Sequence, residues 1–164
     1  MSINSIKIIA VDVDGVMTNG NFYMNETGVI FKNFHTRDMY ALSRATKDGF
    51  KVVFVTGSSD RVIYAKAGKQ YPIISRATDK FVELSKYVIE QGVSWEDVAY
   101  IGDAENDYKC IMEAAFSACP SDAIPEILEH SVYSAHCKGG QGAVYDIIRY
   151  LYRLRKMEWP MENL

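Results

Sequence analysis

The chain has 164 residues, of which 48% are hydrophobic and 24% are charged, enough for one domain with a substantial core. The formal net charge of −3 argues against a nucleic-acid partner. No apolar run approaches the roughly 18 residues that span a bilayer, and the N-terminus lacks the layout of a secretory signal, so we expect no membrane partner. Three cysteines without CxxC spacing fit a reducing cytoplasm. We therefore expect one cytoplasmic domain over residues 1–164.

Apolar runs typical of buried strands alternate with helical stripes along the chain. In chain order, we expect a strand at 6–13, a β-hairpin at about 19–34, a helix at 38–47, a strand at 50–55, a helix at 59–70, a short strand at 72–74, a helix at 79–90 capped by Thr78, a strand at 98–101, a helix at 106–114, a strand at 116–118, a helix at 124–129, a strand at 132–134 and a helix at 143–156. This alternation predicts an α/β domain with a doubly wound, Rossmann-like parallel sheet.

Three of the predicted strands end in polar motifs next to glycine: DVDG at 12–15, TG at 56–57 and GD at 102–103. In such sheets, ligands bind beyond the carboxyl ends of the strands. Asp12 and Asp14 lie two residues apart and point to the same side, so their repulsion calls for a cation such as Mg²⁺. Asp103 would add a third carboxylate. The alternative is that these acids are solvated strand ends and helix caps.

A phosphate site is indicated by the residues that follow the strand at 50–55. Thr56, Gly57 and Ser58 offer a hydroxyl and backbone amides ahead of a predicted helix, which suits a phosphate group. The same residues would also serve as an ordinary helix cap. Lys80 opens the helix at 79–90, where a lone lysine is usually a surface residue.

In this order, DVDGV, TG, Lys80 and GDAEND resemble the haloacid dehalogenase superfamily of aspartate-nucleophile phosphohydrolases. The segments between the motifs are too short for a cap domain of the usual size. Longer stretches, among them VDVDGVMTNGNFYMNETGVIFKNFHTRDMYAL and CKGGQGAVYDII, resemble the 3-deoxy-D-manno-octulosonate 8-phosphate (KDO 8-phosphate) phosphatase family over about residues 6–150. Related phosphatases in that group act on 9-phosphates of sialic-type sugar acids.

The resemblance implies roles for four acids. Asp12 would be the nucleophile that forms an aspartyl-phosphate and also binds Mg²⁺. Asp14 would be the general acid and then the base, with its backbone carbonyl on the metal. Asp103 would complete the set of metal ligands. Asp107 would not bind the metal itself but would orient its ligands.

The resemblance also implies the groups that hold the substrate. Thr56 and the Gly57 amide would hold the phosphoryl oxygens, with Ser58 beside them, and Lys80 would neutralise their charge. Where the family usually carries arginine, this chain has Ser58 and Gln141, and where RDG is common it has Arg37-Asp38-Met39. Arg37, Lys66, Lys138 or Arg61 would have to supply the missing charge, although each is also a plausible surface residue.

The implied function is a Mg²⁺-dependent phosphoric monoester hydrolase acting on a phosphorylated acidic sugar, first KDO 8-phosphate, a substrate that would place it in lipopolysaccharide biosynthesis. The alternatives are a phosphatase of an N-acylneuraminate-type 9-phosphate, and a non-catalytic oligomerisation module related to sugar-nucleotide synthetases. The intact set of charged motifs favours the enzyme. The pattern assigns no role to the tail after Lys156.

The predicted hairpin carries apolar residues on both faces of its two arms, around a turn at 25–28. A two-stranded hairpin cannot bury both faces on one domain, so one face calls for a partner. The resemblance also implies a tetramer in which such hairpins meet. We therefore expect a homotetramer whose interface includes Phe22, Tyr23, Ile30 and Phe31. The alternative is a hairpin folded back onto its own sheet.

Overall fold

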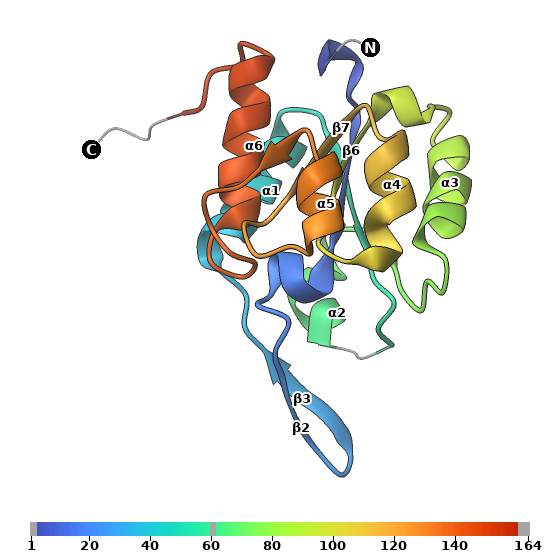
Figure 1. The fold of residues 1–164 in the computed structure, drawn as a ribbon, viewed down its shortest axis with the longest axis vertical. Coiled ribbons are helices and arrows are strands. Elements are labelled where there is room, and N and C mark those ends of the chain that lie inside the picture. The colour runs from blue at the N-terminus through green and yellow to red at the C-terminus, as the bar shows by residue number, and fades with distance from the viewer. Residues whose placement is uncertain (1–2, 60–61, 161–164) are drawn as a thin grey trace.

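The computed structural model describes residues 3–59 and 62–160, and the side chains of Val29, Ile30 and Lys66 lie outside this description. Its centre is a six-stranded sheet in the order β5-β4-β1-β6-β7-β8, with all neighbouring strands parallel (Figure 1). The strands are β1 (Ile8–Asp12), β4 (Lys51–Val55), β5 (Ile73–Ile74), β6 (Val98–Ile101), β7 (Phe116–Cys119) and β8 (Tyr133–Ser134). The expected doubly wound α/β fold is confirmed.

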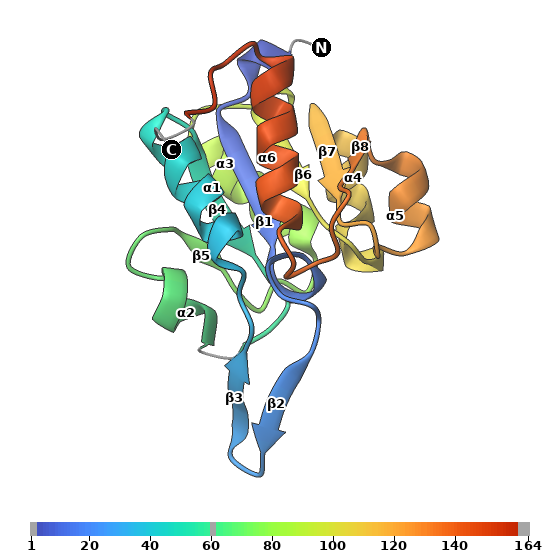
Figure 2. The same cartoon turned by 90° about the vertical axis from the view of Figure 1, so that its left-hand side faces the viewer.

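Helices cover both faces of this sheet (Figure 2). They are α1 (Thr36–Lys47), α2 (Val62–Ala67), α3 (Lys80–Glu90), α4 (Tyr108–Glu113), α5 (Pro125–His130) and α6 (Ala143–Leu154). Helices α1 and α6 pack together on one face, and α3, α4 and α5 lie on the other. No large additional domain covers the sheet within the described part of the chain.

Strand β1 shows why the first apolar run is nearly continuous. All five of its residues are buried. Ile9 and Val11 join the core formed with α1 and α6, whereas Ile8 and Ala10 join the core formed with α3, α4 and α5. A central parallel strand is buried on both faces, so alternating residues feed two separate cores. Asp12 is the last residue of β1 and the first polar residue after this apolar run, at the carboxyl edge of the sheet.

The predicted cap of α3 is wrong, and the α-helix α4 starts two residues later than the approximate start expected for it. Asp79, not Thr78, caps α3, and its carboxylate accepts a hydrogen bond from the Val82 amide at 3.1 Å. The helix expected at 106–114 is instead a 3-10 turn over Glu105–Asp107 followed by the shorter α4. The side chain of Asp107 binds backbone amides that precede it, which holds this tighter turn in place. The helix expected at 59–70 is described only as α2, and residues 60–61 lie outside the described residues.

The predicted hairpin is confirmed as an antiparallel pair, β2 (Phe22–Asn25) and β3 (Gly28–Lys32), which forms its own two-stranded sheet. It projects from the carboxyl edge of the main sheet (Figure 1). Four of its apolar side chains are 49–61% exposed: Phe22, Tyr23, Met24 and Phe31. The alternative of a hairpin folded back onto its own sheet is therefore wrong for the single chain.

The described part of the tail is held by an aromatic cluster. The Trp159 ring lies 5.1 Å from that of Tyr152 and 5.6 Å from that of Tyr145, both on α6, and 6.2 Å from Tyr40 on α1. The tail therefore helps to cover the groove between α1 and α6. Among the described helices, none has both the length and the apolar character needed to cross a bilayer.

Candidate active site

The carboxyl edge of the sheet brings three of the predicted acids together. Asp12 ends β1, Asp103 follows β6, and Asp107 lies in the 3-10 turn beyond it. One carboxylate oxygen from each lies within 4.8 Å of the others. Gly15 leaves room for this approach, because a Cβ atom there would lie 2.1 Å from the Asp103 Oδ2 atom. Its φ of +94° also suits glycine.

Lys80, the first residue of α3, crosses from that helix into the carboxylate cluster. Its Nζ atom donates hydrogen bonds to the Oδ1 atoms of Asp12 at 2.6 Å and Asp107 at 2.7 Å. The Lys80 side chain is only 2% exposed, so the alternative of an ordinary surface lysine is wrong. Burial alone would lower its pKa, but the two carboxylates more than offset this and raise the pKa. Lys80 therefore stays charged.

Asp107 is fixed from several directions. Its Oδ2 atom accepts hydrogen bonds from the backbone amides of Asp103 at 3.0 Å and Ala104 at 3.1 Å. The buried Tyr100 hydroxyl donates to its Oδ1 atom, and burial raises the pKa of Tyr100 well above its usual value. Tyr100 was not predicted from the sequence, where it looks like one more apolar residue of a buried strand. The arrangement orients Asp107 toward both Lys80 and the other two acids.

The cluster carries more negative charge than Lys80 alone can balance. Burial and the charge of Asp107 raise the pKa of Asp12 well above its ordinary value. Burial also raises the pKa of Asp103 to about 6. The Asp103 Oδ1 atom is buried without a hydrogen-bond partner in the described structure. Clustered carboxylates with a free buried oxygen suit a hard divalent cation, so the residues present fit the Mg²⁺ that the sequence predicted.

A cavity of about 170 Å³ opens beside this cluster. It is lined by Asp12, Asp14, Thr56, Gly57, Ser58, Lys80, Ala104 and Asn106. The Thr56 side chain is buried, and its Oγ1 atom accepts a hydrogen bond from the Ser58 amide at 3.0 Å, which fixes the loop after β4. The structure thus places the predicted phosphate-binding residues around one cavity and adds Asn106 to them.

Asp14 lies on the hairpin side of the cavity and has its own cation. The Lys32 Nζ atom donates to the Asp14 Oδ1 atom at 2.7 Å. The Lys32 side chain is 2% exposed, whereas that of Asp14 is 33% exposed. Lys32 is the last residue of β3, so this ion pair joins the hairpin to the site. Sequence reasoning missed Lys32, because a lysine at the end of a hairpin arm is normally solvated.

The structure tests one of the two cations predicted to bind the substrate, Arg37 but not Lys66. Arg37 is exposed in the first turn of α1 and does not line it. The side chain of Lys66 lies outside the described residues. Next to Arg37, the buried Asp38 accepts a hydrogen bond from the Tyr145 amide at 2.8 Å, so it ties α1 to the start of α6.

The glycine-rich GGQG segment supports the loop that follows DVDG. A Cβ atom on Gly139 would lie 1.8 Å from the carbonyl oxygen of Gly15, so the two backbones are in direct contact. The Gly140 amide donates to the carbonyl oxygen of Val16 at 3.0 Å. Gln141 is exposed and does not line the cavity. This segment therefore shapes the site through its backbone.

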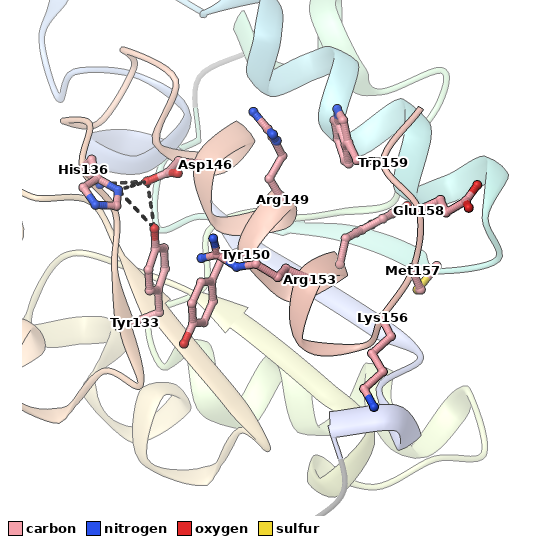
Figure 3. Close-up of a pocket in the computed structure, with 11 residues that line it drawn as sticks. Tyr133, His136, Asp146, Arg149, Tyr150, Arg153, Lys156, Met157, Glu158 and Trp159 are labelled. Atoms are coloured by element: carbon pink, nitrogen blue, oxygen red, sulfur yellow. Dashed lines mark hydrogen bonds and ion pairs between the residues drawn. The ribbon is translucent and has the colours of Figure 1, made fainter. Parts of the chain in front are cut away.

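A larger cavity, of about 540 Å³, lies elsewhere, between α6, β8 and the tail (Figure 3). At one end, the Asp146 Oδ2 atom accepts hydrogen bonds from the Tyr133 hydroxyl at 3.0 Å and the His136 amide at 2.8 Å, and the His136 ring lies 2.9 Å away. Burial would raise the pKa of Asp146, but these bonds lower it. None of the acids of the carboxylate cluster lines this cavity. Size alone therefore does not identify the catalytic site.

The chain is 28% identical to N-acylneuraminate cytidylyltransferase A of Danio rerio over 92% of its own length, but it spans only 36% of that protein. It is 27% identical to the 3-deoxy-D-manno-octulosonate 8-phosphate phosphatase KdsC of Salmonella typhi, covering 87% of this chain and 77% of that one.

Among solved structures, the 3-deoxy-D-manno-octulosonate 8-phosphate phosphatase of Moraxella catarrhalis, in complex with magnesium, phosphate and KDO, superposes with a TM-score of 0.85. It is 27% identical, and the match covers 93% of this chain and 88% of that one. The sequence family described as haloacid dehalogenase-like hydrolase matches residues 58–148, more than half of the chain. The chain therefore belongs to the haloacid dehalogenase-like hydrolase family.

Proposed function

We propose that this protein is a Mg²⁺-dependent phosphatase that hydrolyses a phosphorylated acidic sugar, with KDO 8-phosphate as the first candidate. The observation that carries the proposal is the set formed by the three clustered acids and Lys80 beside a small polar cavity. The likeness to phosphatases of KDO 8-phosphate supports the choice of substrate.

Asp12 is the proposed nucleophile. It lines the cavity, and Lys80 holds one of its oxygens at 2.6 Å, which leaves the other oxygen to attack phosphorus and form an aspartyl-phosphate. Because burial favours the protonated acid, Asp12 needs positive charge nearby to act as a nucleophile. When bound by Asp12, Asp103 and the backbone carbonyl of Asp14, Mg²⁺ supplies charge neutralisation for the nucleophile and the phosphoryl oxygens. Asp107 holds Lys80 and the loop of Asp103 in position.

Asp14 is the proposed general acid and base. Its carboxylate lines the cavity and is partly exposed, so it can reach a leaving-group oxygen and later a water molecule. Lys32 orients it from the hairpin. Thr56 and the amides of Gly57 and Ser58 surround the space where the phosphoryl group would lie.

A second candidate function is favoured by one comparison. The chain aligns along most of its length with about a third of a cytidylyltransferase, so a domain of this kind also occurs within a sugar-nucleotide synthetase. A non-catalytic oligomerisation module is therefore the main competitor. A phosphatase of an N-acylneuraminate-type 9-phosphate is the competitor within the same chemistry.

Turnover of p-nitrophenyl phosphate with and without Mg²⁺ separates the enzyme from the module. We expect Mg²⁺-dependent hydrolysis that EDTA abolishes. Absence of turnover with every divalent metal tested would refute the proposed enzymatic activity. A panel of phosphorylated sugar acids, including KDO 8-phosphate and an N-acylneuraminate 9-phosphate, then ranks substrates by kcat/KM. A higher value for the 9-phosphate would replace the first candidate with the second.

We also propose a homotetramer in which hairpins meet. The exposed rings of Phe22, Tyr23 and Phe31 support an interface, because an isolated two-stranded hairpin with so much exposed apolar surface is unfavourable in water. Ile30, the fourth residue predicted for this interface, has a side chain outside the described residues. Light scattering tests the proposal: a mass near 18.5 kDa, that of one chain, would refute it.

A further inference from the structure

A second cavity borders the same loop as the proposed phosphoryl site. It has a volume of about 530 Å³ and is lined by Ser59, Tyr64, Ser75 and Arg76. Ser58 lines the phosphoryl cavity and the next residue, Ser59, lines this one, so both cavities border the loop after β4. The Arg76 amide donates to the carbonyl oxygen of Ser58 at 3.2 Å, and the Ala77 amide donates to that of Thr56 at 3.1 Å. The segment after β5 is therefore bonded directly to the phosphate-binding loop.

Arg76 has an unusual backbone for its residue type. Its φ is +57°, and Lys156 is the only other non-glycine residue with positive φ in the described chain. Residues other than glycine are strained in this left-handed region, and such strain gathers at functional sites. The backbone conformation of Arg76 is therefore unfavourable. Contacts of its side chain or the hydrogen bond of its amide must offset this cost.

Arg76 also differs from the other cations near the site in its ion pairing. Lys80 is paired with Asp12 and Asp107, and Lys32 is paired with Asp14. Arg76 is exposed and forms no ion pair with any residue that the structure describes. Its guanidinium is thus available to an anionic ligand, which it can bind through two parallel hydrogen bonds.

We propose that Arg76 determines substrate specificity by binding the carboxylate of the leaving sugar in the cavity beside the phosphoryl site. The proposal rests on the function proposed above. The phosphoryl group occupies the small cavity near Asp12, and the sugar acid extends past Ser58 toward Arg76. Ser75 and Tyr64, whose side-chain oxygens lie 2.8 Å apart, supply hydroxyl groups for the sugar on the same wall.

The test compares two substrates that differ in one group: a phosphorylated sugar acid, and the same compound with its carboxylate reduced to an alcohol. Arg76→Gly removes the guanidinium and suits the positive φ, so the fold is expected to be retained and circular dichroism checks it. We expect the ratio of kcat/KM for the acid over the alcohol to fall about ten- to a hundredfold, mainly through KM. Arg76→Lys keeps the charge but loses the paired donors, so its kcat/KM ratio should lie between those of the wild type and Arg76→Gly.

Lys156→Gly is the matched control, because it removes a cation from the other positive-φ position, at the end of α6. It should leave the substrate ratio at the wild-type value. An unchanged ratio in Arg76→Gly, from an enzyme that hydrolyses both substrates, would overturn the role of Arg76 but not the proposed function.

A binding arm separates the two failures when no hydrolysis is seen. The unphosphorylated sugar acid is titrated calorimetrically into the wild type and Arg76→Gly. Loss of binding by about tenfold or more in the variant supports the Arg76 site even without turnover. Equal affinity, or no binding by the wild type, refutes it.

Discussion

The carboxylate cluster and the β2–β3 hairpin differ in how firmly the rest of the molecule holds them. In the cluster, Asp12, Lys80 and Asp107 are almost fully buried and tied to one another by short charged hydrogen bonds. On the hairpin, Phe22 and Tyr23 are about half exposed, and a partly buried ion pair, Lys32 with Asp14, links its base to the site.

The difference in burial between the cluster and the hairpin suits two different parts of the proposed function. Phosphoryl transfer needs charges held in fixed positions, which a buried network at the edge of a central sheet provides. The proposed selection of the leaving group and the proposed assembly of subunits need exposed surface, which is found on the hairpin and on the loop after β5. We expect substitutions in the cluster to affect every substrate, and substitutions at the rim to affect some substrates or the assembly alone.

The largest effect is expected for Asp12→Asn. An amide is a poor nucleophile and a weak metal ligand, so kcat should fall by more than roughly a thousandfold with every phosphorylated substrate. Asp146→Asn, which changes an acid in the larger cavity, is the matched control and should keep wild-type activity. A variant at Asp12 with a tenth of the wild-type rate would rule out the nucleophile assignment.

The next effect concerns the stability of the metal-free protein. The pKa of Asp103 is about 6 in the folded chain, above its ordinary 3.8, so the folded state binds this proton more tightly than the unfolded state does. The free energy of unfolding should therefore fall as pH rises from about 4 through 6, by at most about 3 kcal/mol. This equals about a hundredfold in the folding equilibrium.

Urea denaturation of the wild type and Asp103→Asn across this pH range, both in EDTA, isolates the contribution of Asp103. We expect the stability of the wild type relative to the variant to decline with pH in EDTA. Added Mg²⁺ at pH 7 should restore the stability of the wild type and have much less effect on the variant. A pH-independent difference between the two proteins would show that Asp103 is not strained by the cluster.

A smaller effect, about tenfold in kcat, is expected for Lys32→Met, which keeps the bulk of the side chain but loses its charge. The loss should be greater for a sugar phosphate than for p-nitrophenyl phosphate, because p-nitrophenolate leaves without needing a proton from Asp14. Lys7→Met, at an exposed ion pair with Asp97, is the control. Equal losses with both substrates would show that Lys32 does not act through the general acid.

The smallest effect on the chemistry is expected at the exposed rings of the hairpin. Tyr23 and Phe31 stack with ring centres 4.6 Å apart, so the double variant Tyr23→Ser and Phe31→Lys removes one apolar face. Light scattering should show about a fourfold drop in mass toward 18.5 kDa, with the catalytic residues unaltered. Ile89→Lys, at an exposed apolar residue of α3, should leave the mass unchanged. A monomeric wild type would remove the basis for this comparison.

The sequence by itself was sufficient to predict the sheet, the hairpin and the strand ends that carry Asp12, Thr56 and Asp103. Buried parallel strands are recognisable as apolar runs, and their carboxyl ends must share one edge, so polar residues that follow them are brought together. The resemblance to known phosphohydrolases added Lys80, whose position in a single sequence is typical of the surface.

Only the tertiary structure decided which charges are paired and which are free. Lys80 reaches Asp12 across 68 positions of sequence, and the Lys32–Asp14 pair depends on the path by which the hairpin returns to the sheet. The same holds for Tyr100 beneath Asp107 and for Arg76 beside Ser58, which has no ion-pair partner among the described residues. Local patterns report periodicity and turn chemistry, whereas burial of a charge depends on distant segments packed around it.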